Sequence, residues 1–221
     1  MRLILIRHGQ TPANVKGILE SSVPGPGLTD LGSQQADQLV EALRDVPIDA
    51  LFVSTMVRTH LTAAPLVAAR GLTPVERAGI REISAGDVEG NADEASIHQY
   101  VSTLFAWCEG ELDVRMPGGQ SGHEVIARFD GVVAEAEALG VENVALVSHG
   151  AVIRAWCAAR ATNIDLDFVT DHYVTNTGVV LVDGSFADGW EVVSWLGESV
   201  SEAAAQGVSA DHSPASEHLD E

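Results

Sequence analysis

Short apolar runs alternate along this chain with longer stretches in which apolar residues recur every three or four positions. Short runs of this kind are typical of buried strands, and the longer periodic stretches are typical of helices with one buried face. The runs predict strands or extended segments over residues 2–6, 50–54, 74–83, 143–148, 178–182 and 190–196. The periodic stretches predict helices over residues 56–70, 93–107, 121–139 and 151–161, and a further helix that begins at Thr29 or Asp30.

This alternation predicts an α/β fold, a three-layer α/β/α sandwich whose mainly parallel central sheet is covered on both faces by helices. Right-handed crossovers place the carboxyl ends of the parallel strands on one edge, where open sheets of this kind bind ligands. We therefore expect the functional residues directly after the strands. Whether the last two strands close the sheet or pair with a second copy in a homodimer is open.

The composition changes near residue 197. Residues 198–221 are rich in serine, alanine and acidic residues and contain no lysine or arginine, which is typical of disorder. We expect one folded domain over residues 1–197 and a disordered acidic tail over residues 198–221. His212 and His218 are then solvated tail residues.

Charge narrows the classes of partner. The chain carries 32 acidic residues against 12 lysines and arginines, for a formal net charge of −20. Nucleic acids and anionic membrane surfaces bind basic surfaces, so neither is expected as a partner. An anionic ligand has to be held where the few arginines gather.

Cysteine use and hydropathy predict the compartment. No apolar run approaches the length of a membrane span, and the first residues lack the features of a signal peptide. Cys108 and Cys157 lie far apart and form no metal-binding or redox motif, which favours two reduced thiols. These features predict a cytoplasmic protein.

Two histidines stand directly after predicted strands. His8 follows Arg7 after the strand at 2–6, and His149 follows the strand at 143–148, just before a predicted helix. Neutral imidazole is a nitrogen nucleophile near pH 7, and the free N–H groups at a helix start favour an anion. Either histidine alone could be a buried, hydrogen-bonded residue. Two of them at strand ends, one beside an arginine, indicate a shared site.

An arginine and a carboxyl complete the candidate chemistry. Arg58 lies just beyond the strand at 50–54, and arginine binds phosphate through two N–H groups at once. A carboxyl beside a phosphate ester can protonate the departing alkoxide and then deprotonate the attacking water. Glu82 is one candidate, but Asp87 and Glu89 lie in the same segment, and position alone does not choose among them.

Six segments occur in the order seen in the histidine phosphatase superfamily and resemble its phosphoglycerate-mutase-like branch. They are RHGQTPAN (7–14), LTDLGSQQA (28–36), STMVRTHLTA (54–63), REISAGDVEG (81–90), PGGQSGHEVIARF (117–129) and VSHGAVIRAW (147–156). The resemblance extends from residue 1 to about residue 197. Each segment is short, and it is their order that makes the set specific.

The resemblance implies a role for each candidate residue. His8 corresponds to the nucleophile that forms a phosphohistidine, and Glu82, rather than Asp87 or Glu89, corresponds to the proton donor. His149 is implied as the third catalytic group, because it holds phosphoryl oxygens. The implied phosphate-binding residues are Arg7, Arg58, Asn14 and Gly150. No metal or other cofactor is expected, because cations and backbone dipoles supply the charge stabilisation.

The sequence departs from the family pattern around the substrate. Glu20 and Ser21 stand where many members carry a Gln-Gly pair, His60 stands where a glutamine or another polar residue is common, and Gln120 replaces a glutamate. A carboxylate near a dianionic substrate is repulsive, so the loop is arranged differently or faces a cationic part of the substrate. The departures spare the catalytic residues and leave the substrate open.

Phosphatase is the expected activity, acting on a small phosphorylated metabolite. The runner-up is a phosphoglycerate mutase, but the stretch from residue 86 to 116 holds one cation, Arg115, among many acidic residues, which suits a doubly anionic sugar acid poorly. A non-catalytic phosphate-binding scaffold is a third interpretation, and the intact set of catalytic residues argues against it. A metallohydrolase is disfavoured because Arg7 and Arg58 would repel the metal cation.

Overall fold

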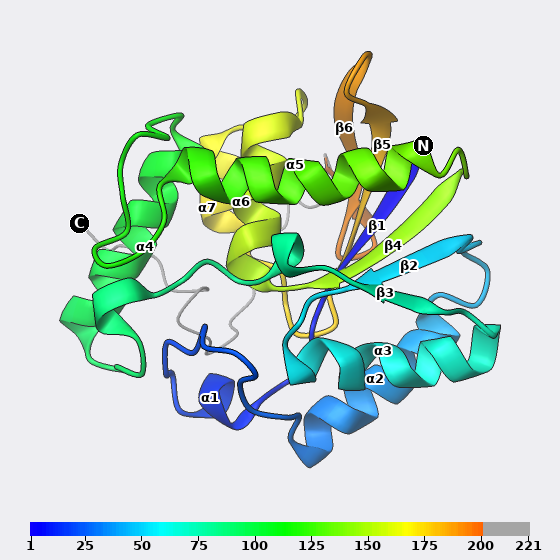
Figure 1. Ribbon diagram of the computed structural model, residues 1–221, viewed down its shortest axis with the longest axis horizontal. Helices are drawn as coiled ribbons and strands as arrows, with labels where there is room; N and C mark the ends of the chain where they lie inside the picture. The colour runs from blue at the N-terminus through cyan, green and yellow to red at the C-terminus, as the bar shows by residue number, and fades with distance from the viewer. Residues whose placement is uncertain (201–221) are drawn as a thin grey trace.

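A seven-stranded sheet forms the centre of the protein in the computed structural model, which describes residues 1–200 (Figure 1). Its strand order is β3-β2-β4-β1-β5-β6-β7. The strands are β1 (Arg2–Arg7), β2 (Ala50–Val53), β3 (Pro74–Glu76), β4 (Asn143–Ser148), β5 (Val179–Ser185), β6 (Gly189–Trp195) and β7 (Glu198–Ser199). Strands β1 to β4 run parallel, and β5 to β7 extend the sheet antiparallel beyond β1.

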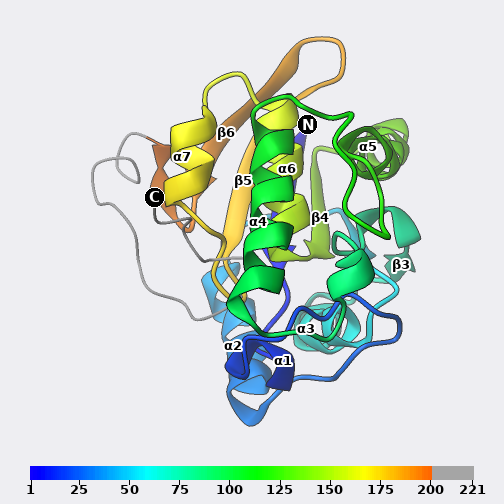
Figure 2. The same cartoon turned by 90° about the vertical axis from the view of Figure 1, so that its left-hand side faces the viewer.

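Helices cover both faces of this sheet, as Figures 1 and 2 show. On one side lie α2 (Asp30–Ala42) and α3 (Val57–Arg70). On the other lie α4 (Glu94–Cys108), α5 (Gly122–Ala138), α6 (Gly150–Arg160) and α7 (Leu166–Asp171). The short helix α1 (Pro12–Val15) follows β1 at the carboxyl edge of the sheet. The predicted three-layer sandwich with a mainly parallel centre is confirmed.

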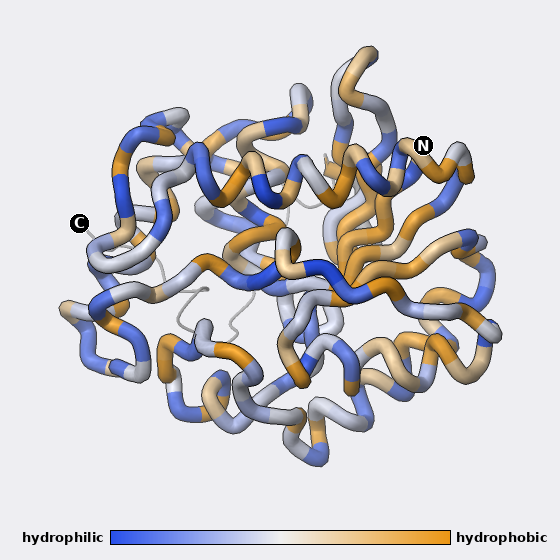
Figure 3. The backbone as a smooth tube through the Cα atoms, viewed as in Figure 1, coloured by the Kyte–Doolittle hydropathy of each residue, from blue (hydrophilic) through white to orange (hydrophobic). Residues whose placement is uncertain are grey.

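Strand β1 shows why the two layers form. Leu3 and Leu5 belong to the core on the α4–α7 side, and Ile4 and Ile6 belong to the core on the α2–α3 side; all four are fully buried. A strand that is buried on both faces needs apolar residues at every position, which is the continuous run seen in the sequence. The strongly apolar strands at the centre stand out in Figure 3.

Several predicted boundaries shift. The segment predicted as extended over residues 74–83 forms only the three-residue strand β3, followed by short 3₁₀ turns at Ala78–Ile80 and Gly86–Val88. The last two predicted strands do close the sheet, and the helices α1 and α7 were not predicted. The predicted disordered tail begins too early, because Glu198–Ser199 pairs with β6 as β7. Residues 201–221, with His212 and His218, lie outside the described residues.

The register of the parallel strands brings three chain positions together. Arg7 pairs with Ser148, and Val53 pairs with Val147, so β2, β4 and β1 end at one level. The residues that follow these ends are Ser54, His149 and His8. Strand β4 lies between the other two strands, which places His149 between Ser54 and His8. Within residues 1–200, no helix is both long and apolar enough to cross a membrane.

Candidate active site

The two predicted histidines meet at the carboxyl edge of the sheet. The ring centroids of His8 and His149 are 5.2 Å apart, with the ring planes inclined at 60°. Both side chains are buried, with exposed fractions of 4% and 0%. The backbone joins them as well, because the His8 N–H donates to the carbonyl of Ser148 at 3.0 Å. The predicted convergence of these histidines is therefore present in the fold.

The hydrogen bonds of His8 fix which ring nitrogen is available. Its Nδ1 lies 2.8 Å from the carbonyl oxygen of Gly9. A carbonyl can only accept, so Nδ1 carries the proton and Nε2 keeps its lone pair. Burial, and after it the charges of Arg58 and Arg7, hold the pKa of His8 well below its usual value. The ring is therefore neutral near pH 7, which is the form that can attack phosphorus.

His149 has the opposite tautomer. Its Nε2 lies 2.8 Å from Ser54 Oγ, and Arg58 Nε donates to its Nδ1 at 3.3 Å. Arginine can only donate, so Nδ1 accepts and Nε2 carries the proton. Burial and the neighbouring Arg58 lower the pKa of His149 well below its usual value, which keeps this ring neutral too.

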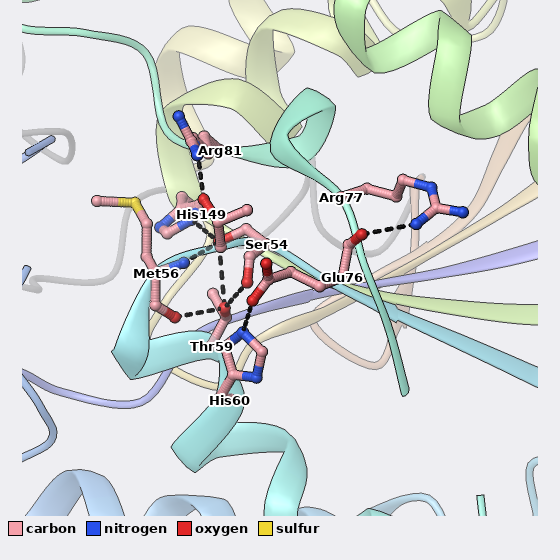
Figure 4. A network of polar contacts seen from close by, with 9 residues as sticks. Ser54, Met56, Thr59, His60, Glu76, Arg77, Arg81 and His149 are labelled. Atoms are coloured by element: carbon pink, nitrogen blue, oxygen red, sulfur yellow. Dashed lines mark hydrogen bonds and ion pairs between the residues drawn. The ribbon is translucent and has the colours of Figure 1, made fainter. Parts of the chain in front are cut away.

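A chain of hydroxyl groups supports that tautomer (Figure 4). Thr59 Oγ1 lies 2.8 Å from the Met56 carbonyl and 2.9 Å from the Ser54 carbonyl, and only the threonine can donate in these contacts. Ser54 Oγ, at 3.1 Å from Thr59 Oγ1, must then donate to it and accept from His149. Neither hydroxyl residue was predicted as part of the site. The signal was weak, since serine and threonine are common after any strand.

The two predicted arginines are also buried at this edge. Arg58 lies in the first turn of α3 and is 2% exposed; its Nη2 donates to the carbonyl of Glu20 at 3.1 Å. Its Nη1 has no hydrogen-bond partner among the described residues. Arg7 is 3% exposed and donates from Nη1 to the carbonyl of Val174 at 2.6 Å. Water screens a buried charge less than an exposed one, so these two cations favour the binding of an anion at the carboxyl edge of the sheet.

Gly150 allows Arg7 to pass close to helix α6. A Cβ added at Gly150 would lie 3.1 Å from Arg7 Nε, closer than nearly all such contacts in proteins. A side chain at this first helical position would displace Arg7 by a few tenths of an ångström. This gives a physical reason for glycine after His149.

Glu82 lies at the amino end of the same helix. Its carboxylate accepts from the backbone N–H groups of Val152 at 2.9 Å, Ala151 at 3.2 Å and Ile83 at 2.9 Å. The free N–H groups and the helix dipole stabilise a negative charge at this position. Because His149 is the N-cap of α6, the carboxylate and the imidazole are held by one helix end. Glu82 lines the same pocket as His8 and Arg58.

Asn14 occupies the pocket wall and also organises the loop after β1. Its Oδ1 accepts from the N–H of Thr11 at 3.0 Å and from Asn176 Nδ2 at 3.3 Å. Asn176 Nδ2 also lies 3.0 Å from the carbonyl of His8. Asn176 therefore braces the backbone of the candidate nucleophile from the segment before β5. Sequence reasoning missed it, because an isolated asparagine carries no pattern.

The other acidic candidates are placed differently. Glu89 holds the loop that follows α1: its carboxylate accepts from the N–H of Ser21 at 2.7 Å and of Ser22 at 3.0 Å, and from the Ser21 hydroxyl. Asp87 is exposed and does not line the pocket with Glu82. Glu82 is the carboxyl of its segment that lines the pocket with His8.

Of the departures from the family pattern, the Glu20–Ser21 pair lies in the pocket. Glu20 is part of the wall, and its Oε1 accepts from the N–H of Ser22 at 3.1 Å. His60 does not line the pocket. Its Nε2 lies 2.9 Å from a carboxylate oxygen of Glu76 (Figure 4). Gln120 accepts from Arg128 at 3.2 Å. The residues that line the pocket are Arg7, His8, Thr11, Ala13, Asn14, Ile18, Leu19, Glu20, Ser21, Arg58, Glu82, Ile83, Ala85 and Tyr100.

Fold and site together define an α/β protein that can hold an oxyanion between arginines, beside a neutral imidazole and a carboxylate. The chain belongs to branch 1 of the histidine phosphatase superfamily, whose sequence profile matches residues 3–197. The membership and the fold predicted from the sequence are thereby confirmed. Within residues 1–200, no group of three or more histidine, cysteine or acidic side chains is arranged to hold a metal ion.

A similar sequence and a similar solved structure are both those of phosphatases. The chain is 30% identical over 166 residues to phosphoserine phosphatase 1 of Hydrogenobacter thermophilus, covering 74% of this chain and 78% of that protein. A mycobacterial glucosyl-3-phosphoglycerate phosphatase structure matches with a TM-score of 0.74 and 29% identity, covering 90% of this chain and 99% of that one. The prediction of a phosphomonoester phosphatase agrees with both.

A third relative is much longer than the aligned region. PE_PGRS11, a PE-PGRS family protein of Mycobacterium tuberculosis, is 34% identical over 215 residues, which cover 90% of this chain. The alignment spans 37% of that protein's length.

Proposed function

We propose that this protein hydrolyses a small phosphomonoester through a phosphohistidine on His8. The observation that carries the proposal is the state of the His8 ring. It is buried and neutral, it lies beside two arginines, and its Nε2 has no hydrogen-bond partner within residues 1–200. These arginines stabilise the charge that builds up on the phosphoryl oxygens during transfer. Asn14 and the backbone at Gly150 complete the proposed phosphate pocket.

The reaction takes two displacements. In the first, Glu82 enters in its protonated form; His8 Nε2 forms a bond to phosphorus as the bond from phosphorus to the alcohol oxygen breaks, and Glu82 gives its proton to that oxygen. In the second, Glu82 takes a proton from water, whose oxygen bonds to phosphorus as the bond to His8 breaks. His149 donates no proton in this scheme. It lies beside His8 and accepts from Arg58 Nε through its Nδ1, which orients the guanidinium toward the phosphoryl oxygens, while Ser54 holds the ring.

Replacing His8 with alanine tests the proposal. We expect the His8→Ala variant to lose hydrolysis of para-nitrophenyl phosphate and to form no acid-labile, base-stable phosphoenzyme, which is the stability typical of a phosphorus–nitrogen bond. His60→Ala is the matched control, since this ring pairs with Glu76 outside the pocket. Activity in the His8 variant that equals that of the wild type would refute a histidine nucleophile.

A phosphoglycerate mutase is the second candidate, because a 2,3-bisphosphoglycerate-dependent phosphoglycerate mutase of Methylobacterium radiotolerans is 33% identical over 133 residues. Among the described residues, the cations of the pocket wall are Arg7 and Arg58, and the same wall includes Glu20. A bound sugar acid with a carboxylate and a second phosphate would face this carboxylate without a matching cation. Exchange between 2- and 3-phosphoglycerate that outruns hydrolysis would favour the mutase.

Two further expectations stay predictions. Cys108 and Cys157 are free thiols in the structure, and burial raises the pKa of the Cys108 thiol to about 11. Thiols of this kind are compatible with the cytoplasm that the sequence predicts, and cell fractionation tests the location. A homodimer is tested by the mass of the protein in solution.

A further inference from the structure

The segment that carries Glu82 has little regular structure of its own. Between β3 and α4 it contains only the 3₁₀ turns Ala78–Ile80 and Gly86–Val88. The segment therefore has few backbone hydrogen bonds of its own to hold the residues around Glu82 in place. A carboxyl that must meet a leaving-group oxygen has to be held within fractions of an ångström, so another element must fix this segment.

Arg128 on α5 makes that connection. Its Nη1 donates to the carbonyl of Gly79 at 2.6 Å and to that of Arg81 at 2.7 Å, and its Nη2 donates to the carbonyl of Glu82 itself at 3.0 Å. Its Nε donates to the side chain of Gln120 at 3.2 Å. Four N–H directions of one planar group are thus used, three of them on the segment around the candidate acid.

The close packing of the two elements supports this contact. A Cβ added at Gly79 would overlap the carbonyl oxygen of Arg128, so the segment lies against the backbone of α5. The pKa of Arg128 is lowered to about 10 because the group is buried, and the charge of Glu82 offsets part of this lowering. The guanidinium remains protonated at neutral pH and is partly buried beside the Glu82 backbone. It does not line the pocket.

We propose that Arg128 is a positioning residue for the general acid. Arg128 donates to the backbone carbonyl of Glu82, while the N–H groups at the amino end of α6 donate to the Glu82 carboxylate. The side chain is thereby fixed at both ends without any contact between Arg128 and substrate. This inference rests on the proposed function, because it assigns Arg128 to the proton transfer rather than to phosphate binding.

Leaving-group dependence separates this role from a merely structural one. An Arg128→Met variant should transfer phosphate from 2,4-dinitrophenyl phosphate to His8 within about threefold of the wild-type rate, because this leaving group departs without a proton. For an alkyl phosphate such as glycerol 2-phosphate, kcat/KM should fall by roughly 10- to 100-fold. Single-turnover phosphoenzyme formation gives the first rate, and steady-state release of phosphate gives the second.

A double variant sharpens the test. In Glu82→Gln the proton transfer is already lost, so adding Arg128→Met should cost little more on the alkyl phosphate. Additive losses would show that Arg128 acts by another route. Equal losses on both substrates in the single variant, or no loss on either, would overturn the proposal.

Controls keep the result interpretable. Arg77 also links this segment to α5, because its Nε donates to the Glu135 carboxylate at 2.6 Å. It precedes the carbonyls that Arg128 binds, so Arg77→Met should leave the leaving-group dependence unchanged. If Arg128→Met does not fold, Arg128→Lys keeps the charge but presents its donors from a single nitrogen instead of a planar fork, and the same selective loss is expected. A wild-type enzyme that forms no phosphohistidine would refute the proposed function, whereas a normal phosphoenzyme with a flat leaving-group response would refute only the role of Arg128.

Discussion

The two neutral imidazoles show how single residues in this site depend on their surroundings. His8 and His149 differ in which nitrogen carries the proton, and a fixed neighbour determines each choice: a carbonyl for His8 and an arginine for His149. One ring is left with a free lone pair next to the arginines, and the other is left with a proton that is bound to serine. A histidine without such partners would exchange between both forms.

Keeping these rings neutral has a consequence for stability. In the folded protein the pKa of His8 lies well below its usual value of 6.5, so between these two pKa values the unfolded chain binds a proton that the native state does not. Unfolding is then favoured as the pH falls. We expect the free energy of unfolding to decrease from pH 7 to pH 5, with one proton contributing at most about 1.4 kcal/mol per pH unit.

The variant that reports this effect is His8→Asn, which removes one of the buried groups. Its free energy of unfolding, measured in urea at both pH values, should fall less steeply with acidification than that of the wild type. His60→Asn is the control, because that ring is partly exposed and pairs with Glu76 outside the pocket. A slope for His8→Asn equal to the wild-type slope would contradict the neutral buried ring.

At the residue scale, the carboxylate of Glu20 in the pocket wall predicts a preference among leaving groups. Its carboxylate repels a leaving group that carries a second anion and attracts one that carries an amine. We expect the wild type to hydrolyse phosphoethanolamine in preference to phosphoglycolate, which has a carboxylate at the corresponding end. Glu20→Gln should narrow the ratio of the two kcat/KM values by roughly tenfold. Glu94→Gln, outside the pocket, is the control, and an unchanged ratio in Glu20→Gln would exclude this role.

At the scale of elements, packing of α2 on the loop after β1 fixes the surroundings of His8. A Cβ at Gly32 would lie within 2.9 Å of the Gln10 backbone nitrogen and still closer to its carbonyl oxygen. Thr29, the N-cap of α2, accepts the Gly32 N–H at 3.0 Å. The helix start and the catalytic loop are therefore in direct backbone contact.

Two glycine substitutions test this contact against helix propensity alone. Gly32→Ala should lower the free energy of unfolding by about 1–3 kcal/mol and reduce activity, because the loop must move. Gly131, in the middle of α5, has open space around its Cα, and Gly131→Ala should stabilise the protein by about 1 kcal/mol. Urea unfolding of both variants measures the difference. Similar effects at the two positions would show that close packing at Gly32 is unimportant.

The elements show where the sequence is informative. β1 and β4 are predictable because burial on both faces leaves an unbroken apolar run, and α3 to α6 are predictable because one buried face repeats at helical spacing. The helices α1 and α7 have four and six residues, too few to show a period. β3 is short because its segment is held by side chains of α5 instead of by a sheet ladder.

The site divides in the same way. Residues next to strand ends, such as His8 and His149, are found by their position. Ser54 and Asn176 act through contacts with residues 95 and 168 positions away along the chain, and Arg128 through a contact 47 positions away. No local pattern marks these residues. Their roles come from the tertiary structure.

The free edges of the sheet matter at the scale of the whole molecule. Beyond its pairing with β5, β6 pairs with β7 only at Ser194 and Trp195. The outer edge of β6 around Val192 is covered by the segment after α6: Asn163 Oδ1 accepts from the Val192 N–H at 2.9 Å, and Asn163 Nδ2 donates to its carbonyl at 2.8 Å. A covered edge does not offer its backbone groups to a second chain.

This arrangement predicts that any homodimer forms through another surface. In Asn163→Ala the N–H and carbonyl of Val192 lose their partners, and β6 becomes a template for strand pairing. We expect the variant to show more self-association than the wild type in light scattering at equal concentration, with the difference growing with protein concentration. Asn91→Ala is the control, because Asn91 Nδ2 binds Ser96 away from the sheet. A wild-type dimer that Asn163→Ala dissociates would reverse the argument, since it would place the dimer interface on this edge.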